Sequence, residues 1–385
     1  MFANIFQYVL VLLMQVEKSP FLGYNKHEIL LRRPLLLMKR LAWLDIAKYI
    51  CIMAVMLEHL ESTTDILGCF FSPFFVLCFF AVAGYTHRAG QPFGAFAIKK
   101  IKTLFVPWLI FSVFDIAVSQ LVSFSVHGSF ITELGWNFLQ IRGHGDQIWF
   151  VAALFMAFFS FWMFIEWYSR KPSSPKRRFV FIIIALALFY ADNYYSSHMD
   201  GALLPWGTPA LPWHIEYLFQ GMFYMTLGYM FREQWEEKFD KINGAAFCIA
   251  VFLVYSIIIY APYFIPVPEF IFGLFAIYIT PLVGIILVFA VSKMIPANRY
   301  MCYIGQNTLI YFALHGKIFS FIEGMLSRFA APIYSAILSS ALLTNIFAVV
   351  FTVLLSLLLI IPAYIINRFF PFVLGRKKKP ELRSA

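Results

Sequence analysis

One apolar segment near the start of the chain contains four ionisable residues. Residues 41–60 include Asp45, Lys48, Glu58 and His59. Charged groups are costly inside a membrane and usually have a function there. An unperturbed histidine titrates close to neutral pH, so its neutral ring can take a proton from a hydroxyl group. His59 is therefore a candidate general base; the alternative is a buried histidine that forms hydrogen bonds between helices.

The spacing of these residues places most of them on one side of a helix. Lys48 and His59 are eleven residues apart, which is three helical turns plus about 20°, so both project from nearly one face, roughly 16 Å apart along the axis. Asp45 precedes Lys48 by three positions and can pair with it. We expect this face to line a lumen, with Lys48 toward the cytoplasm and His59 near the outer leaflet. Alternatively, Asp45 and Lys48 form a structural ion pair at the cytoplasmic interface.

The elements that position these residues are predicted to be transmembrane helices. Apolar residues make up 61% of the 385-residue chain and charged residues only 13%, whereas soluble domains are about a quarter charged. The charge-free block Phe270–Ser292 exceeds the roughly 20 residues that cross a bilayer. The sequence predicts an all-α integral membrane protein, a bundle of about ten transmembrane helices near residues 41–60, 66–85, 104–126, 148–168, 179–195, 213–231, 244–262, 269–292, 301–323 and 340–366.

Positive charge is distributed unevenly between the predicted loops. If the segment before the first span is cytoplasmic, 26 of the 30 Lys and Arg residues fall on the cytoplasmic side. Only Arg142, Lys317 and Arg328 fall toward the opposite side, and Lys48 lies within a span. Membrane proteins carry an excess of Lys and Arg in cytoplasmic loops. The sequence therefore predicts that both termini are cytoplasmic.

The two ends of the chain differ from the predicted bundle at 38–367. Within the N-terminal extension 1–37, Phe2–Val16 is apolar but short for a span. We expect an interfacial helix there, or translation that truly begins at Met38 rather than Met1. Residues 368–385 form a basic cytoplasmic tail, whose run Arg376–Lys379 suits a topology anchor or a contact with anionic lipid.

Several classes of site are not indicated by the sequence. The five cysteines fall in or beside apolar blocks and show no CxxC pairing, so neither a metal site nor a disulfide framework is expected. The chain has no GxSxG motif and no phosphate-binding glycine loop. It also has no nucleic-acid module, and its net charge of +10 is explained by membrane topology. We therefore expect no metal, no bound cofactor and no nucleic-acid partner.

Five segments, in chain order over about residues 40–320, resemble the family-3 membrane acyltransferases, and most closely the stand-alone, fucose-acetylase-like branch. They are Arg40–Lys48 followed by His59, Phe79–Tyr85, Lys99–Trp108, Ile148–Val151 and Gly305–His315. The first matches the family's basic residue, ten intervening positions and histidine. Two positions depart from the pattern: Thr103 stands where the family has arginine, and Ala83 where serine is usual.

The resemblance implies a membrane acyltransferase domain at 38–367 that uses acetyl-CoA as co-substrate. The acyl group, most simply acetyl, would pass to a sugar hydroxyl of a cell-surface polysaccharide or its lipid-linked precursor. The expected location is the bacterial inner membrane, as a multi-pass protein. The lipid bilayer, acetyl-CoA and a carbohydrate acceptor are the expected partners, and glycan-assembly proteins are further candidates.

The chemistry and position of individual side chains suggest their roles in such a reaction, with His59 as general base, and the resemblance adds His315. The residues assigned to the acyl donor are Lys48, Asp45, Lys99, Lys100 and Lys102. The residues assigned to the acceptor are Arg142, His144, Asp146, Trp149 and His315. The alternatives are that the three later lysines are ordinary cytoplasmic charges, and that residues 142–147 form a solvated loop. His214 and Glu216 could line the acceptor side as well.

Two other functions stay open at this point. A polytopic transporter or flippase of a glycan or small molecule also has many helices and ionisable residues within the membrane. Such carriers often consist of two similar halves, and the chain shows no such internal similarity. An inactive relative that holds together a glycan-assembly complex is the third interpretation, because Thr103 and Ala83 depart from the family pattern.

Overall fold

The computed structural model describes residues 41–60, 65–122, 129–145 and 148–376. Over these residues the chain is α-helical with short 3₁₀ and π turns, and its only strand-like pairing is a single bridge between Ile141 and His144. The expected N-terminal extension lies outside the described residues, as does the second half of the predicted basic tail, residues 377–385. The described part divides into two compact units, formed by the described residues of 41–75 with 242–361 and by those of 76–241 with 362–376.

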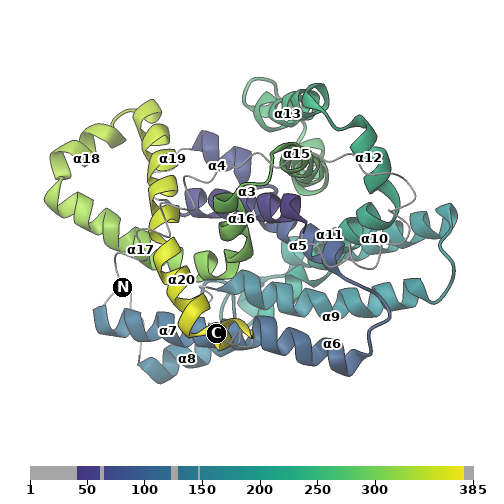
Figure 1. The fold of residues 1–385 in the computed structure, drawn as a ribbon, viewed down its shortest axis with the longest axis horizontal. Helices are drawn as coiled ribbons and strands as arrows, with labels where there is room; N and C mark the ends of the chain where they lie inside the picture. Colours follow the sequence, from purple (N-terminus) through teal and green to yellow (C-terminus); the bar gives the residue numbers. More distant parts are fainter. Residues whose placement is uncertain (1–40, 61–64, 123–128, 146–147, 377–385) are drawn as a thin grey trace, which may run out of the picture. The chain divides into compact units, whose positions relative to one another are not determined.

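The first unit is built around helix α3. Its helices are α3 (Ala42–Glu58), α4 (Asp65–Phe71), α13 (Ala245–Tyr260), α14 (Glu269–Leu274), α15 (Thr280–Met294), α16 (Arg299–Gln306), α17 (Thr308–Phe329), α18 (Ala331–Leu338) and α19 (Ala341–Leu358). Helix α3 contacts α4, α15, α16, α17 and α19, and Figure 1 shows it beside α16. Its buried side chains are almost all apolar, so packing against these neighbours holds it in place.

Helix α16 touches the backbone of α3 directly. Gly305 permits this approach, because a Cβ atom at this position would lie 1.9 Å from the carbonyl oxygen of Asp45. The helix begins at the cap Asn298, whose side chain accepts a hydrogen bond from the backbone N–H of Met301. It ends at Gln306, and after Asn307 the chain starts the new helix α17.

The outer surface of the first unit suits a bilayer. Helix α13 exposes large apolar side chains along its length, including Ile249, Phe252, Leu253, Val254 and Ile257. A contiguous apolar surface of this kind is rare on soluble monomers and marks contact with a membrane or partner. The inner side of α13 is fixed by Tyr255, whose hydroxyl donates to the carbonyl of Phe70 at 2.5 Å.

The second unit comprises α5 (Phe75–Thr86), α6 (Phe93–Lys100), α7 (Val106–Val122), α8 (Phe130–Leu139), α9 (Trp149–Ser169), α10 (Pro175–His198), α11 (Leu218–Met230), α12 (Glu236–Ile242) and α20 (Ile360–Phe369). Helix α11 contacts α9 and α10. It also meets α5 through two glycines: a Cβ at Gly84 would lie 1.9 Å from the carbonyl of Met225, and a Cβ at Gly228 would lie 1.8 Å from that of Ala81. Small residues allow this close packing of membrane helices.

A buried carboxylate fixes the start of α11. Asp192 of α10 accepts hydrogen bonds from the backbone N–H groups of Phe219 at 2.6 Å and Gln220 at 2.9 Å. The first N–H groups of a helix have no partner within the helix, and a negative charge there also interacts favourably with the helix dipole. This polar contact explains why Asp192 lies within an otherwise apolar segment.

Eight helices in the described part are long and apolar enough to cross a membrane: Ile66–Thr86, Phe93–Leu121, Trp149–Ser169, Pro175–His198, Ala245–Tyr263, Glu269–Met294, Thr308–Phe329 and Ala341–Phe369. The other two predicted spans, 41–60 and 213–231, correspond to shorter helices, α3 with 17 residues and α11 with 13. The count of ten and the cytoplasmic placement of both ends remain predictions.

Two span boundaries differ from the sequence prediction for identifiable reasons. The helix predicted to start at residue 104 starts at Phe93, because the π turn Ile101–Phe105 joins α6 to α7 without a break. Lys99, Lys100 and Lys102 therefore lie on a helix. The span predicted to start at residue 301 starts at Thr308, because Asn307 separates α16 from α17.

We expect Gly228→Ala to destabilise the protein by about 3 kcal/mol, because the added methyl group overlaps the Ala81 carbonyl and forces α5 and α11 apart. Gly324→Ala, in α17, is the matched control, since no atom lies within 4 Å of the position that its Cβ would take. Heating detergent-solubilised protein, followed by size-exclusion chromatography, measures both. Equal midpoints for the two variants would contradict the predicted contact.

Candidate functional site

His59 lies at the C-terminal end of α3, where its ring is tied to the helix. Its Nδ1 atom is 2.7 Å from the carbonyl oxygen of Val55. A carbonyl oxygen only accepts hydrogen bonds, so this contact assigns the hydrogen to Nδ1. The Nε2 atom of the neutral ring then carries a lone pair, and the side chain is exposed. This is the tautomer that a general base needs.

His315 of α17 has the same arrangement in a buried position. Its Nδ1 atom is 2.9 Å from the carbonyl of Phe312 and 3.0 Å from that of Tyr311, which again assigns the hydrogen to Nδ1. Only 5% of the residue is exposed. Its Nε2 atom is buried and has no hydrogen-bond partner in the described part of the chain.

The two histidines are in direct contact. Their ring centroids are 4.9 Å apart, and the rings are nearly perpendicular at 89°. The ring of His315 also has an edge contact with Phe319 at 5.7 Å. The sequence prediction selected both histidines for separate roles, as base and as acceptor contact, and the structure brings them together at one place in the first unit.

Asp45 and Lys48 form the ion pair that their spacing predicts. The Nζ atom of Lys48 is 2.7 Å from Oδ1 of Asp45. The other carboxylate oxygen accepts a hydrogen bond from the side-chain amide of Gln306 at 3.0 Å. Asp45 is buried, whereas the side chain of Lys48 keeps 20% of its surface exposed. Asp45 thus joins α3 to α16 and holds Lys48 at the same time.

The face of α3 between Lys48 and His59 is packed. Ile52 and Val55, which share this face, are 0% and 1% exposed. The expected open lumen along the stripe is therefore absent from this stretch of the described structure. The two ends of the stripe, Asp45 with Lys48 and His59 with His315, are separate polar clusters on one helix.

A tyrosine–serine cluster, which the sequence prediction missed, lies elsewhere in the first unit. The hydroxyl of Tyr300 is 2.5 Å from Oγ of Ser356, and Tyr311 donates to the carbonyl of Ser356 at 3.0 Å. The ring of Tyr49 contacts that of Tyr300. These contacts join α3, α16, α17 and α19. The sequence does show these polar residues within apolar spans, but it does not indicate which of them contact one another.

The three lysines assigned to the acyl donor lie in the second unit in different environments. Lys99 and Lys102 are exposed. The Nζ atom of Lys100 lies 3.1 Å from the centre of the Phe158 ring, a cation–π contact. The pKa of the nearby His87 is lowered to about 4, first by burial and then by the charges of Lys100, Arg232 and Lys99. His87 is thus neutral at physiological pH, with three cationic side chains near its ring.

Two of the residues assigned to the acceptor are also brought together in the second unit. The guanidinium of Arg142 lies 4.5 Å from the centre of the Trp149 ring. His144 instead packs on Trp136, with ring centroids 5.0 Å apart. Their loop is closed by Asn137 and Gln140, whose side-chain amides both donate to the carbonyl of Gly145. Asp146 lies outside the described residues.

His214 and Glu216 are placed beside Trp149. The rings of His214 and Trp149 are 5.6 Å apart, and Nδ1 of His214 lies 3.6 Å from Oε1 of Glu216. Glu216 also accepts a hydrogen bond from the backbone N–H of Leu211 at 3.0 Å. Trp213 and His214 both have positive φ angles, +60° and +53°, which are strained for residues with side chains and often occur at functional sites.

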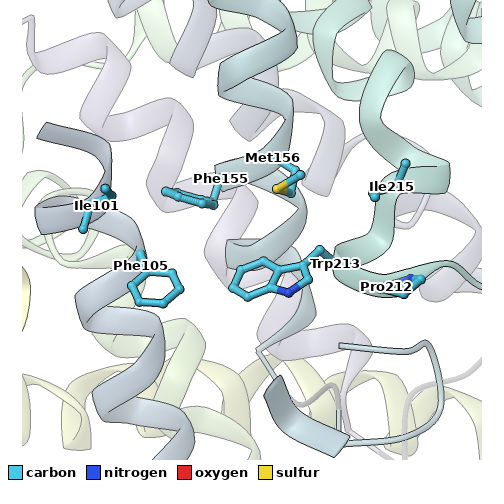
Figure 2. Close-up of a pocket in the computed structure, with 7 residues that line it drawn as sticks. All are labelled: Ile101, Phe105, Phe155, Met156, Pro212, Trp213 and Ile215. Atoms are coloured by element: carbon cyan, nitrogen blue, oxygen red, sulfur yellow. The ribbon is translucent and has the colours of Figure 1, made fainter. Parts of the chain in front are cut away.

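An apolar pocket of about 460 Å³ opens next to this strained turn. Figure 2 shows the ring of Trp213 between Phe105 on one side and Pro212 on the other. The lining residues are Ile101, Phe105, Phe155, Met156, Pro212, Trp213 and Ile215. All are apolar, so the pocket can hold a hydrocarbon group but offers no side chain for acid–base chemistry. Among the described residues, no three His, Cys, Asp or Glu side chains gather as a metal site.

The helical architecture and its eight apolar spans define a multi-pass membrane protein. The comparison with protein families gives a more specific result: the profile described as acyltransferase domain matches residues 41–363. The chain therefore belongs to the family-3 membrane acyltransferases, as the five sequence segments predict, and it is an acyltransferase. The comparisons with curated proteins and with solved structures found no match.

We expect Asp45→Ala to destabilise the protein by about 3 kcal/mol, because it leaves a largely buried ammonium group and an amide without their carboxylate. Asp45→Asn is the control: its side-chain oxygen can still accept from Gln306, so the loss should be less than half as large. The measurement is the thermal unfolding midpoint in detergent. If Asp45→Ala unfolds at the wild-type temperature, the carboxylate of Asp45 does not hold α3 to α16.

Proposed function

We propose that this protein transfers an acetyl group from acetyl-CoA to a sugar hydroxyl of a cell-surface polysaccharide or its lipid-linked precursor, with His59 as general base. The observation that carries the proposal is the 2.7 Å contact between Nδ1 of His59 and the Val55 carbonyl. It orients the ring and leaves Nε2 as a proton acceptor on an exposed side chain, in a chain whose family is an acyltransferase family.

The proposed reaction needs one base and good positioning. The acceptor O–H bond breaks as its proton moves to Nε2 of His59, while the oxygen forms a bond to the thioester carbonyl carbon. The C–S bond then breaks, and the CoA sulfur takes the proton back from the imidazolium. A thioester already has a good leaving group, so deprotonation and orientation of the alcohol are the remaining requirements.

The acyl donor, acetyl-CoA, carries negatively charged phosphate groups, which cationic side chains bind. In the proposal, Lys48, Lys99, Lys100 and Lys102 contribute positive charge toward CoA, and Asp45 orients Lys48. The pKa of His87 is lowered mainly by burial, and the charges of Lys100, Arg232 and Lys99 near its ring lower it further. Because Lys100 is packed on Phe158, the exposed Lys99 and Lys102 are the better candidates for direct phosphate contact.

The acceptor needs hydrogen-bonding groups and an aromatic surface. The proposed contacts are the five residues assigned from the sequence, Arg142, His144, Asp146, Trp149 and His315. The pairing of Arg142 with Trp149 supports this assignment, because a guanidinium held over an indole is oriented to bind oxygen atoms. The protein is proposed to act in the bacterial inner membrane, alongside proteins that assemble the glycan.

We expect His59→Ala to lower transfer by about 10²–10⁴-fold, the usual contribution of a general base, without unfolding the protein. NMR of purified surface polysaccharide measures O-acetyl groups in cells with the wild type, the variant or no protein. Acetyl signals confined to the wild type would establish the reaction and reveal the acceptor position. Full acetylation by a well-expressed His59→Ala variant would exclude His59 as the base.

We expect Lys48→Ala to raise the apparent KM for acetyl-CoA about tenfold, the effect of losing one charge-assisted hydrogen bond, with a smaller effect on acceptor use. Lys238→Ala, at an exposed position of α12, is the control and should leave both constants unchanged. Initial rates with labelled acetyl-CoA in isolated membranes give the two KM values. A change confined to the acceptor KM would move Lys48 out of the donor site.

A further inference from the structure

The contact between His59 and His315 creates an unusual hydrogen-bonding requirement. Each ring uses its Nδ1 hydrogen on a carbonyl four residues earlier in its own helix, Val55 for His59 and Tyr311 for His315. Each neutral ring is therefore left with Nε2 as a lone-pair acceptor. Two rings in contact, with centroids 4.9 Å apart, thus present two acceptors and no donor.

The surroundings of His315 do not meet this requirement. Its Nε2 atom is buried without a hydrogen-bond partner in the described structure, and its ring neighbours besides His59 are Phe312 and Phe319. A buried polar atom without a partner is energetically unfavourable, so such groups in native proteins usually mark an ion, a water or a ligand. The missing group must carry a hydrogen to donate.

A ligand with a single hydroxyl cannot satisfy both rings. In the proposed reaction, that hydroxyl gives its only proton to His59, which leaves His315 without a donor. A ligand with a second hydroxyl can donate to His315 throughout the reaction. Because the two rings touch each other, the two hydroxyls must also be close neighbours, as they are on adjacent carbons of a sugar.

We propose that the acceptor binds as a vicinal diol, with the reacting hydroxyl at Nε2 of His59 and the neighbouring hydroxyl donating a hydrogen bond to Nε2 of His315. This inference rests on the proposed function of His59 and names the acceptor class more narrowly. The proton of the reacting hydroxyl moves to His59 and then to the CoA sulfur. The second hydroxyl keeps its proton, and its oxygen is not acylated in this step.

The wild-type protein provides a first test that needs no variant. NMR of the acetylated polysaccharide locates the ester carbon and its neighbours. The proposal requires that a carbon next to the ester carbon bears a free hydroxyl. An ester whose neighbouring carbons carry no free hydroxyl would overturn the diol while leaving the acyltransferase reaction intact.

Variants of His315 provide the second test. Membranes that contain each variant are assayed with labelled acetyl-CoA and with de-O-acetylated polysaccharide from the same cells as acceptor. We expect His315→Phe, which keeps a ring beside Phe319 but has no acceptor atom, to raise the KM for polysaccharide at least tenfold. The KM for acetyl-CoA should change less than twofold. His315→Gln, which restores an acceptor oxygen, should recover at least a third of the wild-type kcat/KM for polysaccharide.

A third histidine serves as the matched control. His198, at the end of α10, makes the same type of contact with a carbonyl four residues earlier, that of Tyr194, and is exposed. His198→Phe should leave both KM values unchanged. If His315→Phe does not accumulate in the membrane, His315→Gln and the ester position decide the question.

The outcomes separate this inference from the proposed function. A wild-type polysaccharide KM in His315→Phe overturns the diol, and so does an equal rise in both KM values or a failure of His315→Gln to recover activity. Undiminished transfer by His59→Ala would instead overturn the proposed function, and the diol with it. Loss of transfer in His59→Ala, together with a selective and rescued acceptor defect in His315 variants, supports both.

Discussion

The backbone contact between α16 and α3 determines where the functional side chains of the first unit lie. A methyl group at Gly305 would fill the space that the Asp45 carbonyl occupies, so this position depends on the absence of a side chain. The approach brings Gln306 to the Asp45 carboxylate. The helix break at Asn307 follows immediately, and α17 then carries His315 to the other end of α3, where it meets His59. The close contact at Gly305 thus positions Gln306 beside Asp45 in one polar cluster, and the chain that continues from it brings His315 to His59 in the other.

Helix carbonyls have a second role in this unit. In a membrane, backbone groups must find partners inside the protein, and side chains that bond to the preceding turn are a common result. The bonds from His59 and His315 to their own helices fix both rings in orientation and tautomer. The helices therefore supply chemistry as well as position, because the same contact that satisfies Nδ1 exposes the lone pair on Nε2.

The sequence predicted local relationships well and distant ones poorly. The Asp45–Lys48 pair followed from three-residue spacing, and the helical class followed from apolar blocks that occur throughout the chain. The contact of His59 with His315 could not be derived, because the two lie far apart in the chain and no local rule relates their helices. The boundaries at residues 93 and 308 were missed because a π turn continues one helix and Asn307 interrupts another. The strained Trp213–His214 turn was missed for a different reason: its left-handed backbone has no glycine or asparagine to indicate it.

The π turn Ile101–Phe105 sets which way the lysines of α6 face relative to α7. Its closing hydrogen bond runs from the N–H of Val106 to the carbonyl of Ile101, one residue further than in an α-helix. Because this wider turn accommodates one extra residue, removing a single residue there would restore regular α-helical bonding while the segments on both sides keep their facing. Lys100 would then stay on the ring of Phe158. The same deletion in the regular part of α7 would instead turn everything before it by about 100°, so the π turn is the place where this segment tolerates a change of length without redirecting its lysines.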